Sequence, residues 1–169
     1  MRVIPKIDAG LVRAAGLAKM VHLILLVSLL TVASSAGAVT VLTVTNTADT
    51  GAGSLRDRIT TANGTSGIVV IEFDIPAGST IAPQTALPEI TGNNTYVAGL
   101  DAVILDGQNV AGINDHGLYV SGTGCIVQGL TIVNFNGAGV RLHGSNNGVY
   151  ACRLGTDGAV AFPNDTGIS

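Results

Sequence analysis

The chain has 169 residues, of which 47% are hydrophobic and only 11% are charged. This composition excludes intrinsic disorder, which requires low hydrophobicity and high net charge. The length predicts one domain, and the abundance of Gly, Thr, Val, Ile, Ala and Asn favours short strands joined by tight turns over long helices.

The N-terminal segment, residues 1–38, has the organisation of a signal peptide. Four basic residues precede an apolar stretch at residues 21–33, and small residues ending in Ala36-Gly37-Ala38 follow it. This order predicts a signal-peptide helix and cleavage after Ala38. The alternative is an uncleaved membrane anchor, but the apolar stretch has about 13 residues and a bilayer core requires about 20. We therefore expect a protein that is secreted or held at the cell surface or outer membrane.

Cleavage after Ala38 would leave residues 39–169, with four basic and ten acidic side chains and a net charge of about −6. The mature chain would contain no lysine. Nucleic acid and anionic membranes attract basic patches. Nucleic acid is therefore not an expected partner, and no membrane span is expected after cleavage.

Two strands are predicted before residue 95. Val39–Thr45 alternates apolar and polar side chains, as a half-buried strand does. Ile68–Phe73 is a nearly continuous apolar run, which is typical of a buried strand. We assign residues 39–94 to an N-terminal cap with the first strands, and residues 95–169 to repeated coils.

One helix is predicted, at residues 54–64, between these two strands. Ser54 is a good N-cap, and Asp57 follows three residues later as an acidic variant of the capping box. Asn63-Gly64 ends the helix with residues that tolerate a positive φ.

A short motif, Asn-x-x-Gly followed by an aliphatic residue, recurs three times in the second half of the chain. The first interval between copies is about 22 residues and the second is about 28 residues, with extra turn residues within Thr156–Pro163. Such a period is typical of a solenoid, in which each coil buries its inner face on its neighbours. The copies are Asn114–Leu118, Asn136–Val140 and Asn164–Ile168.

The 22-residue spacing also aligns the residues between the copies. Apolar residues fall over apolar residues, and Gly129 falls over Ala151 where the alternation slips, which indicates a corner between two strands. The sequence therefore predicts an all-β fold, a right-handed parallel β-helix with coils of about 22 residues and a short N-terminal capping helix. The aligned pairs are Leu118 with Val140, Tyr119 with Arg141, Val120 with Leu142, Gly122 with Gly144, Val127 with Val149, Gln128 with Tyr150, Leu130 with Cys152, Thr131 with Arg153 and Ile132 with Leu154.

The repeat assigns roles to its Asn and Gly residues and to the two cysteines. Each Asn is expected at a corner, where its amide can bond the neighbouring coil. Each Gly is expected to lead into the next strand with a φ that other residues avoid. Cys152 falls in an inward column and Cys125 in a turn over Asn147, so a disulfide between them is not expected, although an exported chain can form one.

Six segments of the chain share the pattern of a known group of proteins. They are Val44–Arg56 (VTNTADTGAGSLR), Ile71–Pro76, Leu87–Thr91, Ile104–Gly107, Gly129–Phe135 and Leu154–Asp157. In these segments the chain resembles large bacterial exported β-helix proteins, and the resemblance covers residues 40–169. It implies the pectin-lyase-like fold, with the predicted helix capping the N-terminal end. It implies little about activity, because such proteins are mostly of unknown role and one fold hosts many functions.

No active site is recognisable in the coils, so we predict no catalytic, cofactor-binding or metal-binding residues and no cofactor. A glycosidase needs two carboxylates at a fixed separation, and the outward columns hold no carboxylate pair. The polygalacturonase motifs Asn-x-Asp, Asp-Asp, Gly-His-Gly and Arg-x-Lys are absent. The expected function is an exported or cell-surface, non-catalytic β-helix protein with a structural, adhesive or display role. The alternative is a fragment of a polysaccharide lyase or glycosidase that acts on acidic polysaccharide, with its site mostly outside this segment.

Carbohydrate or other cell-surface molecules are the expected partners, and three polar features bear on them. Asp115-His116 is faintly similar to a pectate-lyase signature, but the repeat already explains it as part of a turn. Arg141 and His143 share a strand face with Tyr119 beside Arg141, which suits a small sugar or an anion, or else a solvated face with a contact of about 0.5–1 kcal/mol.

Asp157 is the third feature and lies in the sequence Gly-Thr-Asp-Gly. Its carboxylate could ligate calcium at a turn, but Asp is also a common turn residue. The chain then stops after Ile168 and Ser169, at the start of a new coil. We expect a fragment of a longer protein, or an open edge that pairs with downstream coils or with another chain.

Overall fold

The structure, a computed structural model, describes residues 38–112 and 115–169. The predicted signal peptide lies outside the described residues except for Ala38, and so does Asn114 of the first motif copy. No helix in the described part of the chain is long and apolar enough to cross a membrane.

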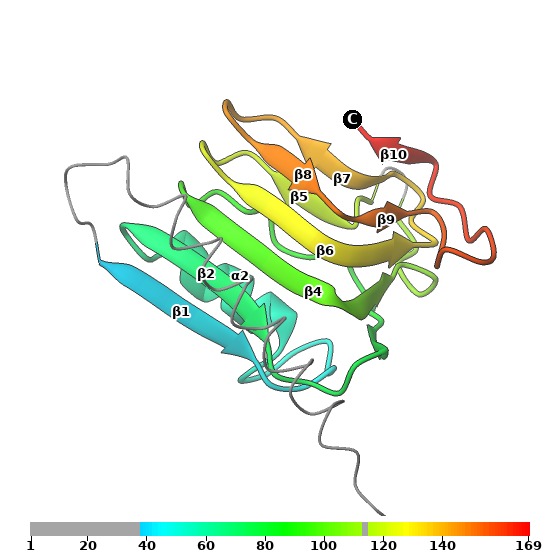
Figure 1. Cartoon of the computed structure of the whole chain (residues 1–169), viewed down its shortest axis with the longest axis horizontal. Coiled ribbons are helices and arrows are strands. Elements are labelled where there is room, and N and C mark those ends of the chain that lie inside the picture. The colour runs from blue at the N-terminus through cyan, green and yellow to red at the C-terminus, as the bar shows by residue number, and fades with distance from the viewer. Residues whose placement is uncertain (1–37, 113–114) are drawn as a thin grey trace, which may run out of the picture. The chain divides into compact units, whose positions relative to one another are not determined.

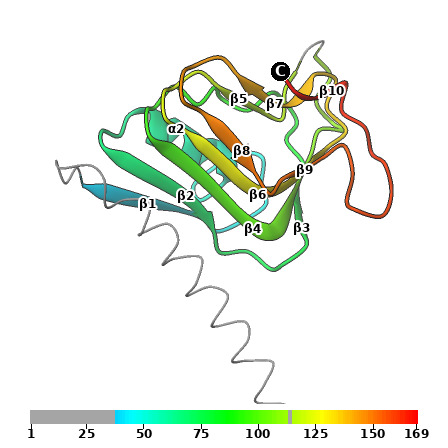
Figure 2. The ribbon, with the colours of Figure 1, turned by 45° about the horizontal axis from the view of Figure 1, so that its top comes forward.

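The described residues form two parallel β-sheets that face each other across a common core (Figure 1). The first sheet has the strand order β1-β2-β4-β6-β8, with β3 beside β4 and β9 beside β6, and Figure 2 shows the second sheet, β10-β7-β5, opposite it. The chain passes repeatedly from one sheet to the other, so the fold is the predicted parallel β-solenoid, with about 5 turns. The strands are β1 (Val39–Val44), β2 (Ile68–Phe73), β3 (Ser79–Ile81), β4 (Thr95–Asp106), β5 (Leu118–Val120), β6 (Ile126–Val133), β7 (Ala138–Leu142), β8 (Gly148–Tyr150), β9 (Arg153–Leu154) and β10 (Thr166–Ile168), and the helix is α2 (Leu55–Asn63).

The predicted 22-residue register is confirmed in both sheets. In the second sheet, Tyr119 on β5 lies beside Arg141 on β7. In the first sheet, β6 pairs with β8 and with β9 at the same spacing. The longer step to the third motif copy is also confirmed, because Ile168 on β10 lies beside Val140 on β7.

The predicted coil length is too short for the solenoid as a whole. Val69 pairs with Thr95, and a turn of the solenoid takes about 26 residues. Tyr96 pairs with Ile126, which is a still longer step along the chain. Loops between stacked strands can lengthen without disturbing the stacking, and the earlier coils have the longer loops.

Two columns of aliphatic side chains fill the core beneath the first sheet. Each column stacks like residues on neighbouring strands, which removes them from water and stabilises the fold by about 1.5–3 kcal/mol for each fully buried side chain. One column is Leu42, Ile71, Val97, Val127 and Val149, and the other is Ile81, Leu105, Ile132 and Leu154.

Asn136 and Asn164, the two motif Asn residues that the structure describes, bond the preceding coil, as predicted. Asn164 donates from Nδ2 to the carbonyl oxygen of Ile132 (2.8 Å), and its Oδ1 accepts from the backbone N–H of Phe135 (3.0 Å). Asn136 donates from Nδ2 to the carbonyl oxygen of Val110 at a longer 3.4 Å. The amides therefore satisfy backbone groups that a solenoid corner would leave without partners.

The predicted reason for the motif Gly is wrong. None of Gly117, Gly139 and Gly167 has a positive φ. A Cβ at Gly117 would instead collide with the carbonyl oxygen of Gly139 in the next coil, and a Cβ at Gly139 would lie 2.7 Å from Nδ2 of Asn164. Close approach of neighbouring coils, and not backbone conformation, therefore requires glycine at positions 117 and 139, whereas a Cβ at Gly167 would make only ordinary contacts, the nearest at 3.9 Å.

Positive φ occurs instead at the predicted corner within the first sheet. Gly129 (φ 65°) and Ala151 (φ 50°) both bend the chain there, and Leu100 (φ 54°) bends β4 at the corresponding place. The bend does not interrupt β4 or β6, so these strands have 12 and 8 residues and are longer than the short pieces that the turn residues indicated.

Helix α2 packs against β1 and β2 and bonds the segment of residues 89–92, which is bridged to β5 through Ile90 and Val120. Its N-cap is Ser54, whose side chain accepts from the backbone N–H of Asp57, as predicted. Asn63 ends the helix by donating to the carbonyl oxygen of Glu89 and accepting from the N–H groups of Thr91 and Gly92 in the coil above. The helix ends at Asn63-Gly64 as predicted, although Gly64 has φ −93° and does not adopt the positive φ that it tolerates.

The two cysteines form no disulfide. Cys152 is partly buried and packs against the core, in agreement with its predicted inward column. Cys125 lies in the turn before β6, as predicted, but it is 2% exposed and belongs to the core. Its Sγ points to the carbonyl oxygen of Gly92 (3.2 Å), and burial raises the pKa of this thiol.

Candidate functional site

The outer face of the second sheet carries four side chains that contact one another, which we call the basic–aromatic cluster: His116, Tyr119, Arg141 and His143. Pairing of β5 with β7 places Tyr119 beside Arg141, and the guanidinium carbon lies 5.2 Å from the centre of the Tyr119 ring. The same ring meets His116 edge-on at 6.0 Å and His143 at 6.4 Å between ring centres. The predicted Tyr–Arg contact is therefore confirmed.

The surroundings of His116 determine where its proton sits. Nδ1 lies 2.8 Å from the backbone nitrogen of Ala138, and a backbone N–H can only donate, so Nδ1 is the acceptor. A neutral imidazole then carries its proton on Nε2. Nε2 lies 3.1 Å from Nη1 of Arg141, which is also a donor. These two donors therefore face each other 3.1 Å apart and cannot bond each other, so an acceptor that reaches both would relieve this contact.

The charge on His116 follows from the same neighbours. Burial lowers the pKa of His116 first, and the positive charge of Arg141 lowers it further, while Asp115 acts in the opposite direction. The lowered pKa keeps the imidazole neutral at pH 7 and preserves its bond from Ala138. The fixed charge of the cluster is then that of Arg141.

The sequence placed three of these four residues together and missed the fourth. Arg141, His143 and Tyr119 share a strand face in the 22-residue register. His116 was assigned to a turn with Asp115, and it does lie in the segment before β5, but its ring turns back onto Arg141. The 22-residue register contained the information needed to place His116, because it aligns His116 with Ala138, next to the cluster.

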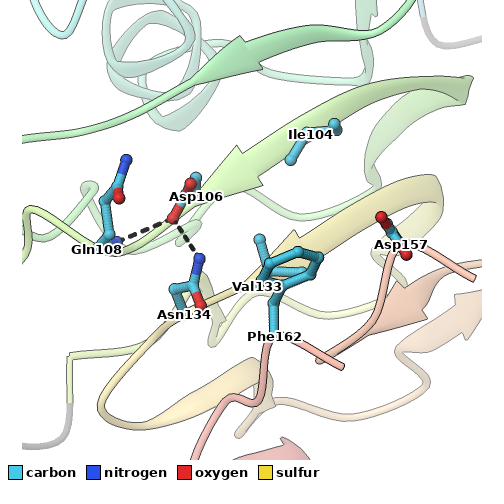
Figure 3. A pocket seen from close by; sticks show the side chains of 7 residues that line it. All are labelled: Ile104, Asp106, Gln108, Val133, Asn134, Asp157 and Phe162. Carbon is cyan, nitrogen blue, oxygen red and sulfur yellow. Dashed lines mark hydrogen bonds between the residues drawn. The ribbon is translucent and has the colours of Figure 1, made fainter. Parts of the chain in front are cut away.

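A second candidate site is a hollow of about 540 Å³ on the outer face of the first sheet (Figure 3). Its apolar part consists of Ile104, Val133 and Phe162. Asp106 and Asn134 line it where β4 and β6 end, and Asp157 lines it from the loop between β9 and β10. In Figure 3, Val133 and Phe162 lie between the two carboxylates.

The loop that completes the hollow is the insertion that lengthens the last repeat. Thr156 forms an antiparallel bridge with Ala161, and Thr156 Oγ1 donates to the carbonyl oxygen of Val160 (2.8 Å). The carbonyl oxygen of Phe162 accepts from the backbone N–H of Asn134 (3.3 Å), which holds the loop against the end of β6.

The carboxylate of Asp157 organises the tip of this loop. Its Oδ1 accepts from the backbone N–H groups of Ala159 (2.8 Å) and Val160 (2.7 Å). These two bonds lower the pKa of Asp157, and Arg153 contributes further. The structure adds no further ligand to Asp157 as a calcium site. The described residues contain no group of three or more His, Cys, Asp or Glu side chains that could hold a metal ion.

The fold places this chain in the class of parallel β-solenoid proteins. No protein-family model, no curated protein and no solved structure matches it. The function must therefore be argued from the two sites.

Proposed function

We propose that this chain is an exported, non-catalytic β-helix protein that adheres to acidic polysaccharide at a cell surface through the basic–aromatic cluster. The pattern of the N-terminal segment supports export, and the resemblance to bacterial exported β-helix proteins of the pectin-lyase-like fold supports an extracellular role. The proposal depends on one observation above all, the pair of adjacent N–H donors on His116 and Arg141.

A uronic acid carboxylate matches this donor pair. It has two oxygens, and it can accept from Nε2 of His116 and from the guanidinium of Arg141 at the same time. The ring of Tyr119 offers an apolar face beside the guanidinium, against which the carbon atoms of a sugar can pack. Tyr119 and Arg141 lie on the neighbouring strands β5 and β7, so the regular stacking of the coils sets their relative position.

Binding of the purified protein to polygalacturonate, measured by calorimetry at low salt, tests this proposal. We expect Arg141→Gln to weaken binding by at least tenfold, because a bond to a charged group is worth about 1.5–3 kcal/mol. Arg153→Gln is the matched control, because it removes the same charge from β9 on the other sheet. Equal weakening by both variants would mean that the protein binds through its overall charge and would overturn the proposal.

A polysaccharide lyase is the second candidate, and a second histidine near the cation of Arg141 favours it. Arg141 could balance the charge that develops when the proton next to a uronate carboxylate is removed. His143, whose ring contacts Tyr119 beside Arg141, could accept that proton, whereas His116 has Nδ1 bonded to Ala138 and its proton on Nε2. Asp157, by contrast, has the low pKa that a glycosidase general acid must not have. Release of unsaturated oligosaccharide by the purified protein, lost in His143→Gln, would replace the non-catalytic proposal with this one.

A further inference from the structure

The inserted loop of residues 156–163 is not required for two neighbouring coils to stack. The preceding coil pairs Leu118 with Val140 without such an insertion, and the extra residues of the last coil fold over the outer face of β6. Insertions in repeat proteins gather on one face, which is often the face that binds. The hollow beneath this loop is separate from the basic–aromatic cluster, because it opens on the first sheet and shares no residue with it.

Hydrogen bonds to one carboxylate oxygen hold each of the two acidic side chains of the hollow, Asp106 and Asp157, in place. Asp106 accepts at Oδ1 from the backbone N–H of Gln108 (3.0 Å) and from Nδ2 of Asn134 (2.9 Å). Asp157 likewise accepts its two backbone N–H groups at Oδ1. None of these bonds uses Oδ2 of either residue, so each carboxylate can accept one more donor while it keeps its position.

The charge and shape of the hollow select the ligand. No basic side chain lines it, and Arg153, which acts on Asp157 electrostatically, lies outside the lining. An acidic ligand would be repelled, and a neutral one would leave both negative charges without partners. A metal ion would need its ligands to converge on one point at about 2.3–2.6 Å, whereas Figure 3 shows the carboxylates on either side of Phe162 and Val133.

We propose that this hollow binds a linear organic dication, an α,ω-diaminoalkane, with one ammonium group at Asp106 and the other at Asp157. The methylene chain packs between them on Ile104, Val133 and the ring of Phe162. The volume of about 540 Å³ lies in the usual range for small-molecule sites. Phe162 also offers its ring to an ammonium group as a cation–π partner.

Calorimetry of the purified protein at low salt tests this assignment with putrescine, cadaverine and butylamine, which carries only one ammonium group. We expect the better diamine to bind about fivefold more tightly than butylamine, because it forms a second exposed ion pair. Asp106→Asn and Asp157→Asn should each reduce diamine affinity about fivefold and bring it close to that of butylamine. Both variants keep an oxygen for the existing bonds, and circular dichroism checks their fold.

Two further variants separate this site from general attraction of cations. Asp165→Asn removes the same charge from an exposed residue outside the lining and should leave the affinity unchanged. Arg153→Gln removes the positive charge that acts on Asp157 and should tighten diamine binding about twofold. The proposal is overturned if butylamine binds as tightly as the diamines, if Asp165→Asn weakens binding as much as Asp157→Asn, or if calcium chloride binds there and the diamines do not.

Discussion

Replacing Gly122 by alanine should lower the free energy of unfolding of the solenoid, because it disturbs the contact between three coils. A Cβ at Gly122 would collide with the carbonyl oxygen of Gly92 in the coil below, and a Cβ at Gly144 would in turn collide with that of Gly122. Both clashing atoms belong to the backbone, so no side-chain rotation relieves them. The added methyl group must push neighbouring coils apart.

The cost can be worked out from the bonds at this position. The backbone N–H groups of Ser121 and Gly122 both donate to the carbonyl oxygen of Ile90 at 3.0 Å. Separation of the coils weakens one or both bonds, at about 1 kcal/mol each, and overpacking adds about 1–3 kcal/mol. We therefore expect Gly122→Ala to lower the free energy of unfolding by about 2–5 kcal/mol.

Urea unfolding followed by circular dichroism measures this loss. The control is Gly64→Ala, where φ is −93° and a Cβ would lie 3.7 Å from the carbonyl oxygen of Thr61, an ordinary contact. We expect the control to stay within about 0.5 kcal/mol of the unsubstituted protein. If Gly122→Ala is equally harmless, then the coils can separate freely and the argument from close stacking is refuted.

Three further outcomes follow from single side chains and are measured by the same unfolding assay. Arg56→Ala should lower the free energy of unfolding by about 2–3 kcal/mol, because the guanidinium of Arg56 bonds Asp49 and two carbonyl oxygens at residues 85–86. Arg58→Ala, which removes an ion pair with Asp57, should lower it by less than about 1 kcal/mol. Asn164→Ala should cost about 1–3 kcal/mol and more than Asn136→Ala, which loses only one long bond. The pKa of His116 is lowered from 6.5 in the folded state, so the neutral ring contributes to the free energy of unfolding. This contribution should be complete above pH 6.5 and should be lost as the pH falls from 6.5 through the lower pKa of the folded state. In His116→Gln this part of the pH dependence should vanish, and its persistence would count against the assignment.

The stacking register could be read from the sequence because each coil repeats the same inward pattern. Apolar residues match at the 22-residue spacing because they occupy the same inward column. Two such matches are confirmed by the strand pairing, Val127 with Val149 and Ile132 with Leu154. Coil length was harder to predict, because the motif occurs only in the last coils. The earlier coils contain longer loops, and the Asn-x-x-Gly motif does not mark their boundaries.

The reasons for individual residues were less accessible than their positions. A repeated Gly is equally compatible with a positive φ and with the close approach of a neighbouring coil. At Gly117, the nearby carbonyl oxygen of Gly139 shows that close approach is the reason. Conversely, Ala151 and Leu100 adopt positive φ although neither residue type favours it. Stacking against the neighbouring strands imposes the bend there, so the alignment with Gly129 marks the corner in the sequence, but the residue types at positions 100 and 151 do not.

The candidate sites divide in the same way between what repeats and what does not. Tyr119 and Arg141 meet because they occupy one column, so the register predicts their contact. Asp106 and Asp157 belong to no common column, and they line one hollow only because the insertion folds back over β6. A repeat pattern describes the surface that every coil shares, and it treats an insertion as a departure from that pattern. In a solenoid, the residues that differ most from the repeat are therefore the first place to look for a site that only one coil provides.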